Sequence, residues 1–97
     1  MRVAVSKRGV YHADLYCSDT SAAKKALREH RVSLLAIDFY LKGRDNGVTI
    51  IAWGKVKNVL PQYVVVTESE RSKRILLSLE LKNAGYCSAD GTTFMKY

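Results

Sequence analysis

The segment from Val32 to Gly47 places the strongest constraint on how this chain can fold. Residues 32–37 form a mostly apolar run that ends next to Asp38, and a loop containing Gly43 leads from there into a helical pattern. A short, continuous apolar run is typical of a strand buried in a parallel sheet. Because ligands bind beyond the carboxyl ends of strands in open α/β sheets, the segment predicts a site around Asp38.

The rest of the chain continues this alternation of strand and helix patterns. Strand patterns occur at residues 2–6, 11–17, 32–39, 63–67 and 92–97, and helical patterns at 20–31, 46–59 and 69–84. The order predicts an α/β fold with a mostly parallel sheet of about five strands, three helices and right-handed crossovers. The first two strands are expected to form a hairpin-like pair or to be neighbours joined by a tight loop, and the last pattern to be one strand or a small hairpin. With 97 residues and a single proline, residues 1–97 are predicted to form one globular domain.

Helical spacing and capping residues predict how the helices begin, end and face the core. The buried stripe expected for the second helix is Val48, Ile51, Ala52, Val56 and Val59, and that for the third includes Ile75, Leu76 and Leu79. The expected helix starts are Ser18-Asp19-Thr20, Asn46 and Ser69. Gly85 is expected to end the third helix in the left-handed conformation.

Charge and composition narrow the class of protein. The net charge of +7 favours a negatively charged partner, such as nucleic acid, a nucleotide or an acidic protein face; the alternative is a solvated basic surface without a dedicated partner. No apolar run approaches the roughly 20 residues of a membrane span. The N-terminal segment lacks the apolar stretch of a signal peptide, so we expect a cytoplasmic protein. Cys17 and Cys87 are expected to be buried thiols, because two cysteines make neither a metal site nor a disulfide framework.

Several short motifs between Val32 and Tyr97 follow the pattern of a known family. They are Asp38 with Leu41, Gly43 and Gly47, then Thr67 at a strand end, Ala84-Gly85 after a helix, and Lys96-Tyr97. The pattern resembles the response-regulator receiver family and its pseudo-receiver relatives. In outline it is closer to the small receiver-like family predicted to process cyclic phosphates, which also lacks the first helix. The resemblance implies a small flavodoxin-like receiver fold without the first and last helices.

The chain differs from both families at the positions of their metal-binding and catalytic residues. The magnesium-binding acids of a receiver are replaced by Ser6-Lys7, and the histidines of the cyclic-phosphate family are missing from Asp38-Phe39-Tyr40-Leu41 and from Thr67-Glu68-Ser69. We therefore expect a degenerate pocket without catalytic residues, formed by Asp38, Tyr40, Asp45, Thr67 and Lys96. No cofactor is expected. Mg²⁺ would bind only if this residual acid site works, with Asp38 as the weak metal candidate, because Mg²⁺ needs near-octahedral oxygen coordination.

Other interpretations of these residues stay open. Asp38 has a structural alternative, in which it caps the following loop or pairs with Lys42 or Lys96. His12 and Asp14 lie two apart on one strand and so share a face, where a catalytic pair is the alternative to two surface residues. His30 is expected to be a packed or surface histidine.

Two surfaces are expected to meet a partner. Without the first and last helices of a receiver, one face of the sheet is bare, which predicts a protein partner or a homodimer at that face. The alternative is that the second strand and the terminal hairpin fold over it. A basic rim for phosphate or partner contact is expected near the strand ends, formed by Lys7, Arg8, Arg71 and Arg74.

The leading functional hypothesis is a non-catalytic receiver-like binding module that acts as an adaptor or inhibitor. Stand-alone degenerate modules of this kind often occur in phages or mobile elements. The first alternative is a metal-dependent phosphoesterase acting on cyclic or terminal phosphates, in which Asp38 holds the metal, Thr67 or Ser69 contacts phosphate and Arg71 or Lys96 neutralises charge. The second alternative is a small basic nucleic-acid-binding protein.

Overall fold

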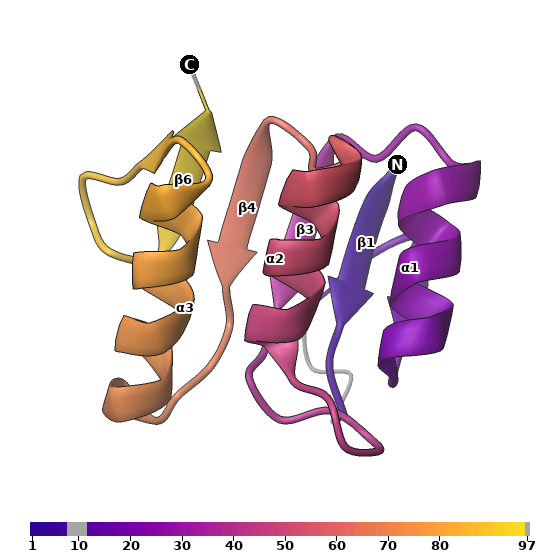
Figure 1. The fold of residues 1–97 in the computed structure, drawn as a ribbon, viewed down its shortest axis with the longest axis horizontal. Helices are drawn as coiled ribbons and strands as arrows, with labels where there is room; N and C mark the ends of the chain where they lie inside the picture. Colours follow the sequence, from indigo (N-terminus) through magenta and orange to yellow (C-terminus); the bar gives the residue numbers. More distant parts are fainter. Residues whose placement is uncertain (8–11, 97) are drawn as a thin grey trace.

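The computed structural model describes residues 1–7 and 12–96, which form six strands and three helices (Figure 1). In chain order the elements are β1 Arg2–Val5, β2 Leu15–Cys17, α1 Thr20–Glu29, β3 Leu34–Ile37, α2 Gly47–Lys57, β4 Tyr63–Val66, α3 Arg71–Asn83, β5 Tyr86–Cys87 and β6 Thr93–Lys96. None of these helices, within the described ranges, has the length and apolar character needed to cross a membrane.

The six strands form one sheet in the order β2-β1-β3-β4-β6-β5. The first four strands of this order are parallel, whereas β6 is antiparallel to both β4 and β5. The mostly parallel α/β fold predicted from the sequence is therefore confirmed, with a sixth strand because the chain end forms a hairpin. The first two strands are parallel neighbours and not a hairpin-like pair. The order 2-1-3-4 is that of small flavodoxin-like sheets.

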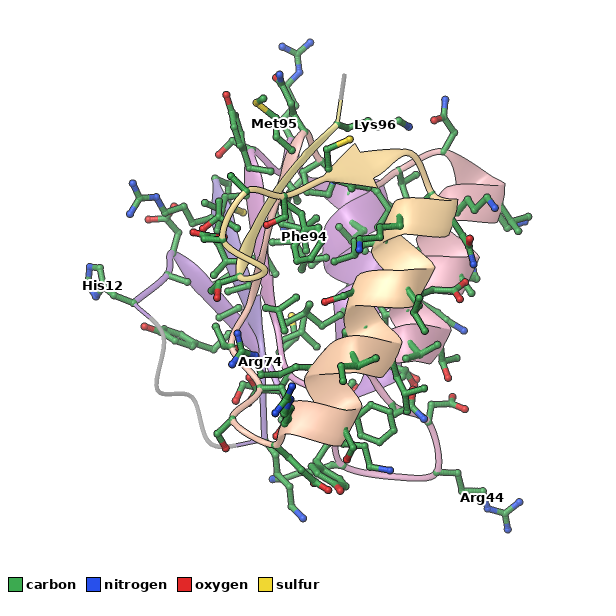
Figure 2. All side chains as sticks on the ribbon, turned by 90° about the vertical axis from the view of Figure 1, so that its left-hand side faces the viewer. His12, Arg44, Arg74, Phe94, Met95 and Lys96 are labelled. Atoms are coloured by element: carbon green, nitrogen blue, oxygen red, sulfur yellow. The ribbon has the colours of Figure 1, made fainter. Side chains whose placement is uncertain are left out.

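All three helices cover the same face of the sheet (Figures 1 and 2). The steps from β2 to β3, from β3 to β4 and from β4 to β5 run in one direction across the sheet. Because crossovers between parallel strands are right-handed, helices on three such steps fall on one side. The step from β1 to β2 runs in the opposite direction, and His12, close to its end, lies on the side away from the helices (Figure 2).

The core lies between the helices and one set of alternating strand residues. Val3, Leu35, Val64 and Phe94 are register neighbours across the sheet, and each is at most 1% exposed. The positions between them point to the opposite face, because successive side chains of a strand alternate. The opposite face carries no helix, as expected, but its centre is not bare, because Ala4 and Ala36 are each 1% exposed. The strand β2 and the terminal hairpin extend the sheet instead of folding over it.

The helix termini follow the capping residues of the sequence in two of three cases. Asp19 accepts a bond from the Ala22 backbone N–H at 2.8 Å, and Asn46 accepts one from Val48 at 2.9 Å. The N-cap of α3 is Glu70, with no side-chain cap bond, so the expected cap at Ser69 is wrong. Gly85 adopts a φ of 94°, which confirms the left-handed residue predicted after this helix.

The third helix is turned away from the orientation that we expected. Leu77 and Leu81 are fully buried, whereas Ile75, Leu76 and Leu79 are exposed. The residues from 75 to 81 offer apolar side chains on several faces, so the spacing alone does not choose between two stripes. The same correction applies to Val56 of α2, which is 80% exposed while Ile50 is buried.

Tyr86 fixes the hairpin strand β5 to the start of β4. Its ring is 2% exposed, and its hydroxyl donates a hydrogen bond to the Pro61 carbonyl. Burial disfavours the phenolate and raises the pKa of Tyr86 to about 12. Tyr86 is therefore a neutral hydrogen-bond donor in the folded protein.

The orientation of α3 predicts unequal effects of two neighbouring substitutions. Leu77→Ala should lower the free energy of unfolding by about 2–5 kcal/mol, because it opens a cavity in the core. Leu76→Ala removes an exposed side chain and should change it by less than about 0.5–1 kcal/mol. Denaturant unfolding followed by circular dichroism measures both, and equal losses would contradict the described orientation.

Tyr86 predicts a loss of stability at alkaline pH. The phenol of an unfolded chain has a pKa of about 10, so above that pH the unfolded state binds fewer protons than the folded state. Linkage then lowers the free energy of unfolding as pH rises. This contribution is fully present below about pH 10 and is lost as pH approaches the folded pKa of about 12.

The measurement compares the wild type with Tyr86→Phe by denaturant unfolding across this pH range. The variant lacks the titrating group, so the stability advantage of the wild type should shrink by roughly 2 kcal/mol. An advantage that stays constant with pH would show that Tyr86 does not titrate in this way.

Candidate functional site at the carboxyl edge of the parallel strands

Asp38 lies directly after β3, at the edge where the parallel strands end. Its side chain is 2% exposed. The Ser6 hydroxyl, from the end of β1, donates to Oδ2 at 2.5 Å, and the Thr67 hydroxyl, from the end of β4, donates to Oδ1. The Asp38 backbone N–H also donates to the Val5 carbonyl at 3.0 Å. The carboxylate therefore joins the ends of three neighbouring strands.

A second buried carboxylate lies near Asp38, in the segment that follows β4. Glu68 is 5% exposed, and its two oxygens accept hydrogen bonds from the backbone N–H groups of Phe39 and Glu70, each at 3.0 Å. Glu68 is a residue of this site that the sequence motifs do not indicate. Its position two residues after the end of β4, next to Thr67, is the signal that would have placed it at this edge.

Gly47 lets the start of α2 close over Asp38. A Cβ atom at this position would clash with the Asp38 carbonyl oxygen. The Gly47 N–H donates to the Phe39 carbonyl at 2.9 Å, which closes the loop from 38 to 47. The loop glycine seen in the sequence is thus needed for a close backbone approach at the site.

Aromatic and charged side chains form the outer part of the site. The Tyr40 hydroxyl donates to Glu70 Oε2 at 2.6 Å; this bond raises the pKa of Tyr40 and lowers the pKa of Glu70. The Phe39 and Tyr40 rings meet edge to face, with centroids 5.1 Å apart. The Lys73 ammonium lies 4.9 Å from the centre of the Phe39 ring. These contacts link the loop after β3 to the first turn of α3.

The site has the shape of an open cavity of about 360 Å³. Its lining residues are Lys7, Asp38, Tyr40, Glu68, Ser69 and Glu70. Three carboxyl side chains therefore face one ammonium group. Like charges within a few ångströms repel, so this cavity disfavours a phosphate group.

The structure brings together only part of the expected pocket. Asp38, Tyr40 and Thr67 lie together, whereas Asp45 accepts a bond from the Thr20 hydroxyl at 3.2 Å and does not line the cavity. Lys96 lies at the opposite edge of the sheet, because β6 is antiparallel to β4 (Figure 2). The prediction that Lys96 lies beside Asp38 is therefore wrong. Neither Lys42 nor Lys96 forms an ion pair with Asp38.

The expected basic rim is divided between two places. Lys7 lines the cavity of Asp38, whereas Arg71 and Arg74 line a separate cavity beside α3. Arg8 lies outside the described residues. Within the described residues, Lys7 therefore does not share a cavity with Arg71 and Arg74.

The described histidines and Cys87 do not line this cavity, whereas Cys17 ends β2 at the same edge of the sheet, where its carbonyl accepts a hydrogen bond from the Ser6 backbone N–H at 2.9 Å. His12 and His30 are exposed, and Asp14 accepts a bond from the Arg2 backbone N–H at 2.8 Å. Cys17 is buried as expected, but Cys87 is exposed, which corrects that prediction. In the part of the chain that the structure describes, no three His, Cys, Asp or Glu side chains are grouped as metal ligands would be.

Asp38→Ala tests the clamp at the strand ends. The substitution removes the acceptor that the hydroxyls of Ser6 and Thr67 share, so the free energy of unfolding should fall by about 2–4 kcal/mol. The control Asp45→Ala removes an exposed carboxylate with one hydrogen bond and should cost less than about 1 kcal/mol. If both variants unfold at the same denaturant concentration, Asp38 does not join the strands in the way described.

Comparison with known proteins gives no match to a family model, to a curated protein or to a solved structure. The receiver-like resemblance stays a prediction from the motifs.

Proposed function

We propose that this chain is a non-catalytic binding module of receiver-like architecture, which docks a protein partner on its helix-free sheet face and acts as an adaptor or inhibitor. The observation that carries the proposal is the division of the sheet: all three helices lie on one side, and the strand residues Tyr16 and Tyr63 are exposed on the other. Exposed apolar surface of this kind marks sites of association.

The exposed apolar surface of the helix-free face lies on both sides of its centre, and Tyr16 of β2, which is 50% exposed, belongs to one of these sides. At its centre, Ala4 and Ala36 are each 1% exposed, so that region offers a partner little surface. Tyr63 of β4 is 41% exposed, and its register partner Met95 of β6 is half-buried. The proposal places the docking surface on the half formed by β4, β6 and β5, because Tyr63 and Met95 are neighbours there and line one hollow.

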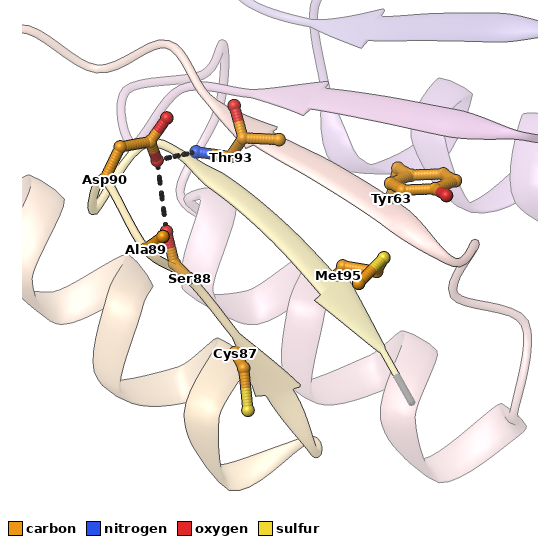
Figure 3. Close-up of a pocket in the computed structure, with 7 residues that line it drawn as sticks. All are labelled: Tyr63, Cys87, Ser88, Ala89, Asp90, Thr93 and Met95. Atoms are coloured by element: carbon orange, nitrogen blue, oxygen red, sulfur yellow. Dashed lines mark hydrogen bonds between the residues drawn. The ribbon is translucent and has the colours of Figure 1, made fainter.

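A hollow of about 460 Å³ lies on this half (Figure 3). Its lining residues are Tyr63, Cys87, Ser88, Ala89, Asp90, Thr93 and Met95. An aromatic ring, a thioether and a thiol form its apolar part. Aromatic residues and methionine are enriched in protein interfaces, which favours a protein over a charged ligand at this place.

The rim of the hollow is held in shape by Asp90. Its Oδ1 atom accepts hydrogen bonds from the backbone N–H groups of Thr93 and Thr92, at 2.8 and 2.9 Å. These bonds lower the pKa of Asp90, so the carboxylate is ionised at neutral pH. A preformed rim reduces the entropy that binding costs.

The two alternatives have less support from the geometry. A phosphoesterase would use the Asp38 cavity, whose three carboxyl groups repel phosphate. A nucleic-acid-binding protein is supported by the net charge of +7, but the expected basic rim is divided between two cavities. The proposal places the protein in the cytoplasm, where the free thiols Cys17 and Cys87 stay reduced. The same resemblance favours an origin in a phage or mobile element, where stand-alone degenerate receiver-like modules often occur.

Tyr63→Glu tests the docking surface, with Val56→Glu as the matched control. Both substitutions place a carboxylate at an exposed position, but Val56 lies on α2, on the helix side. Affinity capture from cell lysate, with nuclease present, should recover a protein with the wild type and with Val56→Glu. Recovery with Tyr63→Glu should fall about tenfold or more, because a charge buried in an interface without a partner costs several kcal/mol.

Sedimentation velocity over a range of concentrations separates a homodimer from a foreign partner. Self-association that Tyr63→Glu abolishes would identify a second copy of the chain as the partner. Equal recovery by the wild type and both variants, or recovery that depends on nucleic acid, would contradict docking on this face.

A further inference from the structure

A third cavity lies beside α3, next to the loop between β5 and β6. Its volume is about 340 Å³, and its lining residues are Arg71, Arg74, Ile75, Ser78 and Gly91. Two guanidinium side chains and a hydroxyl residue thus meet in one hollow. No acidic side chain occurs among these described lining residues, in contrast to the cavity of Asp38.

One of the two arginines is already positioned. Arg74 is half-buried, and its Nη2 atom donates to the Thr92 hydroxyl at 3.1 Å, which holds the side chain against the β5–β6 loop (Figure 2). An arginine that is fixed before binding loses less rotamer freedom when a ligand arrives. The fork of a guanidinium matches the oxygens of phosphate in geometry as well as charge.

The second arginine is free to complete the site. Arg71 lies three residues before Arg74 and so on the same side of the helix. It is exposed, and neither arginine forms an ion pair with a described residue. Lys73, between them in sequence, lies over the Phe39 ring instead. The positive charge of the cavity is therefore not neutralised by the described part of the protein.

An apolar wall limits what the cavity fits. Ile75 is 50% exposed and lines the hollow together with the arginines. A ligand with a charged group at the arginines and an apolar or aromatic group against Ile75 would use both features. A free inorganic anion would use only one.

We propose that this cavity binds a phosphate monoester, with the phosphate between Arg71, Arg74 and the Ser78 hydroxyl and the organic group against Ile75. The site does not depend on the proposed function, because the protein partner would dock on the helix-free sheet face and the arginines belong to α3. Its residues also differ from those around Asp38, so the phosphate chemistry expected at the strand ends is not invoked.

Titrations followed by the amide NMR signals of Ser78 and Gly91 test the proposal. The probes are phenyl phosphate, inorganic phosphate, benzoate and chloride, each at the same ionic strength. Phenyl phosphate should give saturable shifts and bind more tightly than inorganic phosphate, because it also contacts Ile75. Benzoate should bind more weakly than phenyl phosphate, because it lacks the third oxygen and the second negative charge.

Two variants show whether the arginines form the site. Arg71→Gln should weaken phenyl phosphate binding by about tenfold or more, which is the effect expected for losing a charge-assisted pair. Arg71 is exposed and makes no hydrogen bond that folding needs, so this variant should fold normally. The control Lys82→Gln removes the same charge from the last turn of α3 and should change the affinity by less than about twofold.

Three results would overturn the proposal. They are shifts that do not saturate with phenyl phosphate, an equal response to chloride or benzoate, and equal weakening in Arg71→Gln and Lys82→Gln. The last two would show that only the general positive charge of the protein attracts the anion. Loss of the protein partner in Tyr63→Glu has no bearing on these measurements.

Discussion

The Asp38 carboxylate is the contact on which the arrangement of the strand ends depends. Two hydroxyl groups, from Ser6 and Thr67, donate to its two oxygens, and each comes from a different neighbouring strand. A buried carboxylate is costly unless hydrogen bonds replace its water shell. Here that replacement comes from the residues that follow β1 and β4, so these hydrogen bonds form only when the three strands are in register. An acid at this place can thus be explained by the sheet itself, without a substrate.

Chain direction explains how three chemically different surfaces arise in such a small sheet. Three crossovers that step in the same direction leave the helices on one side and an apolar hollow on the other. Carboxylates gather where the parallel strands end, and arginines line the flank of α3. The hollow and the arginine cavity both include residues of the β5–β6 loop, Asp90 in the first and Gly91 in the second.

Much of this architecture follows from local sequence signals. The element order, the caps Asp19 and Asn46, and the left-handed Gly85 are all visible in short segments, because each depends only on its immediate neighbours. The orientation of α3 is different. Apolar residues occur on several faces between Ile75 and Leu81, and the side that turns inward is decided by packing against the sheet.

The candidate site was predicted less completely than the fold. The receiver resemblance implies that Asp38 and Thr67 lie together, and the structure agrees because each directly follows a parallel strand. Lys96 was misplaced, because the direction of the last strand depends on the hairpin formed with β5. Glu68 is visible from the sequence only through its position two residues after β4, and its bond from the Phe39 backbone N–H depends on the neighbouring strand.

Because β6 is antiparallel to β4, the C-terminal end of the described chain lies at the same edge of the sheet as Met1. Met1 is held by the carbonyl of Arg31, just before β3, and Lys96 pairs with Gln62, just before β4. Both ends therefore leave the molecule at the amino edge of the parallel strands (Figure 1). A support or fused protein attached through either end would approach from that edge. The carboxylate cavity would then point outward, away from the attachment.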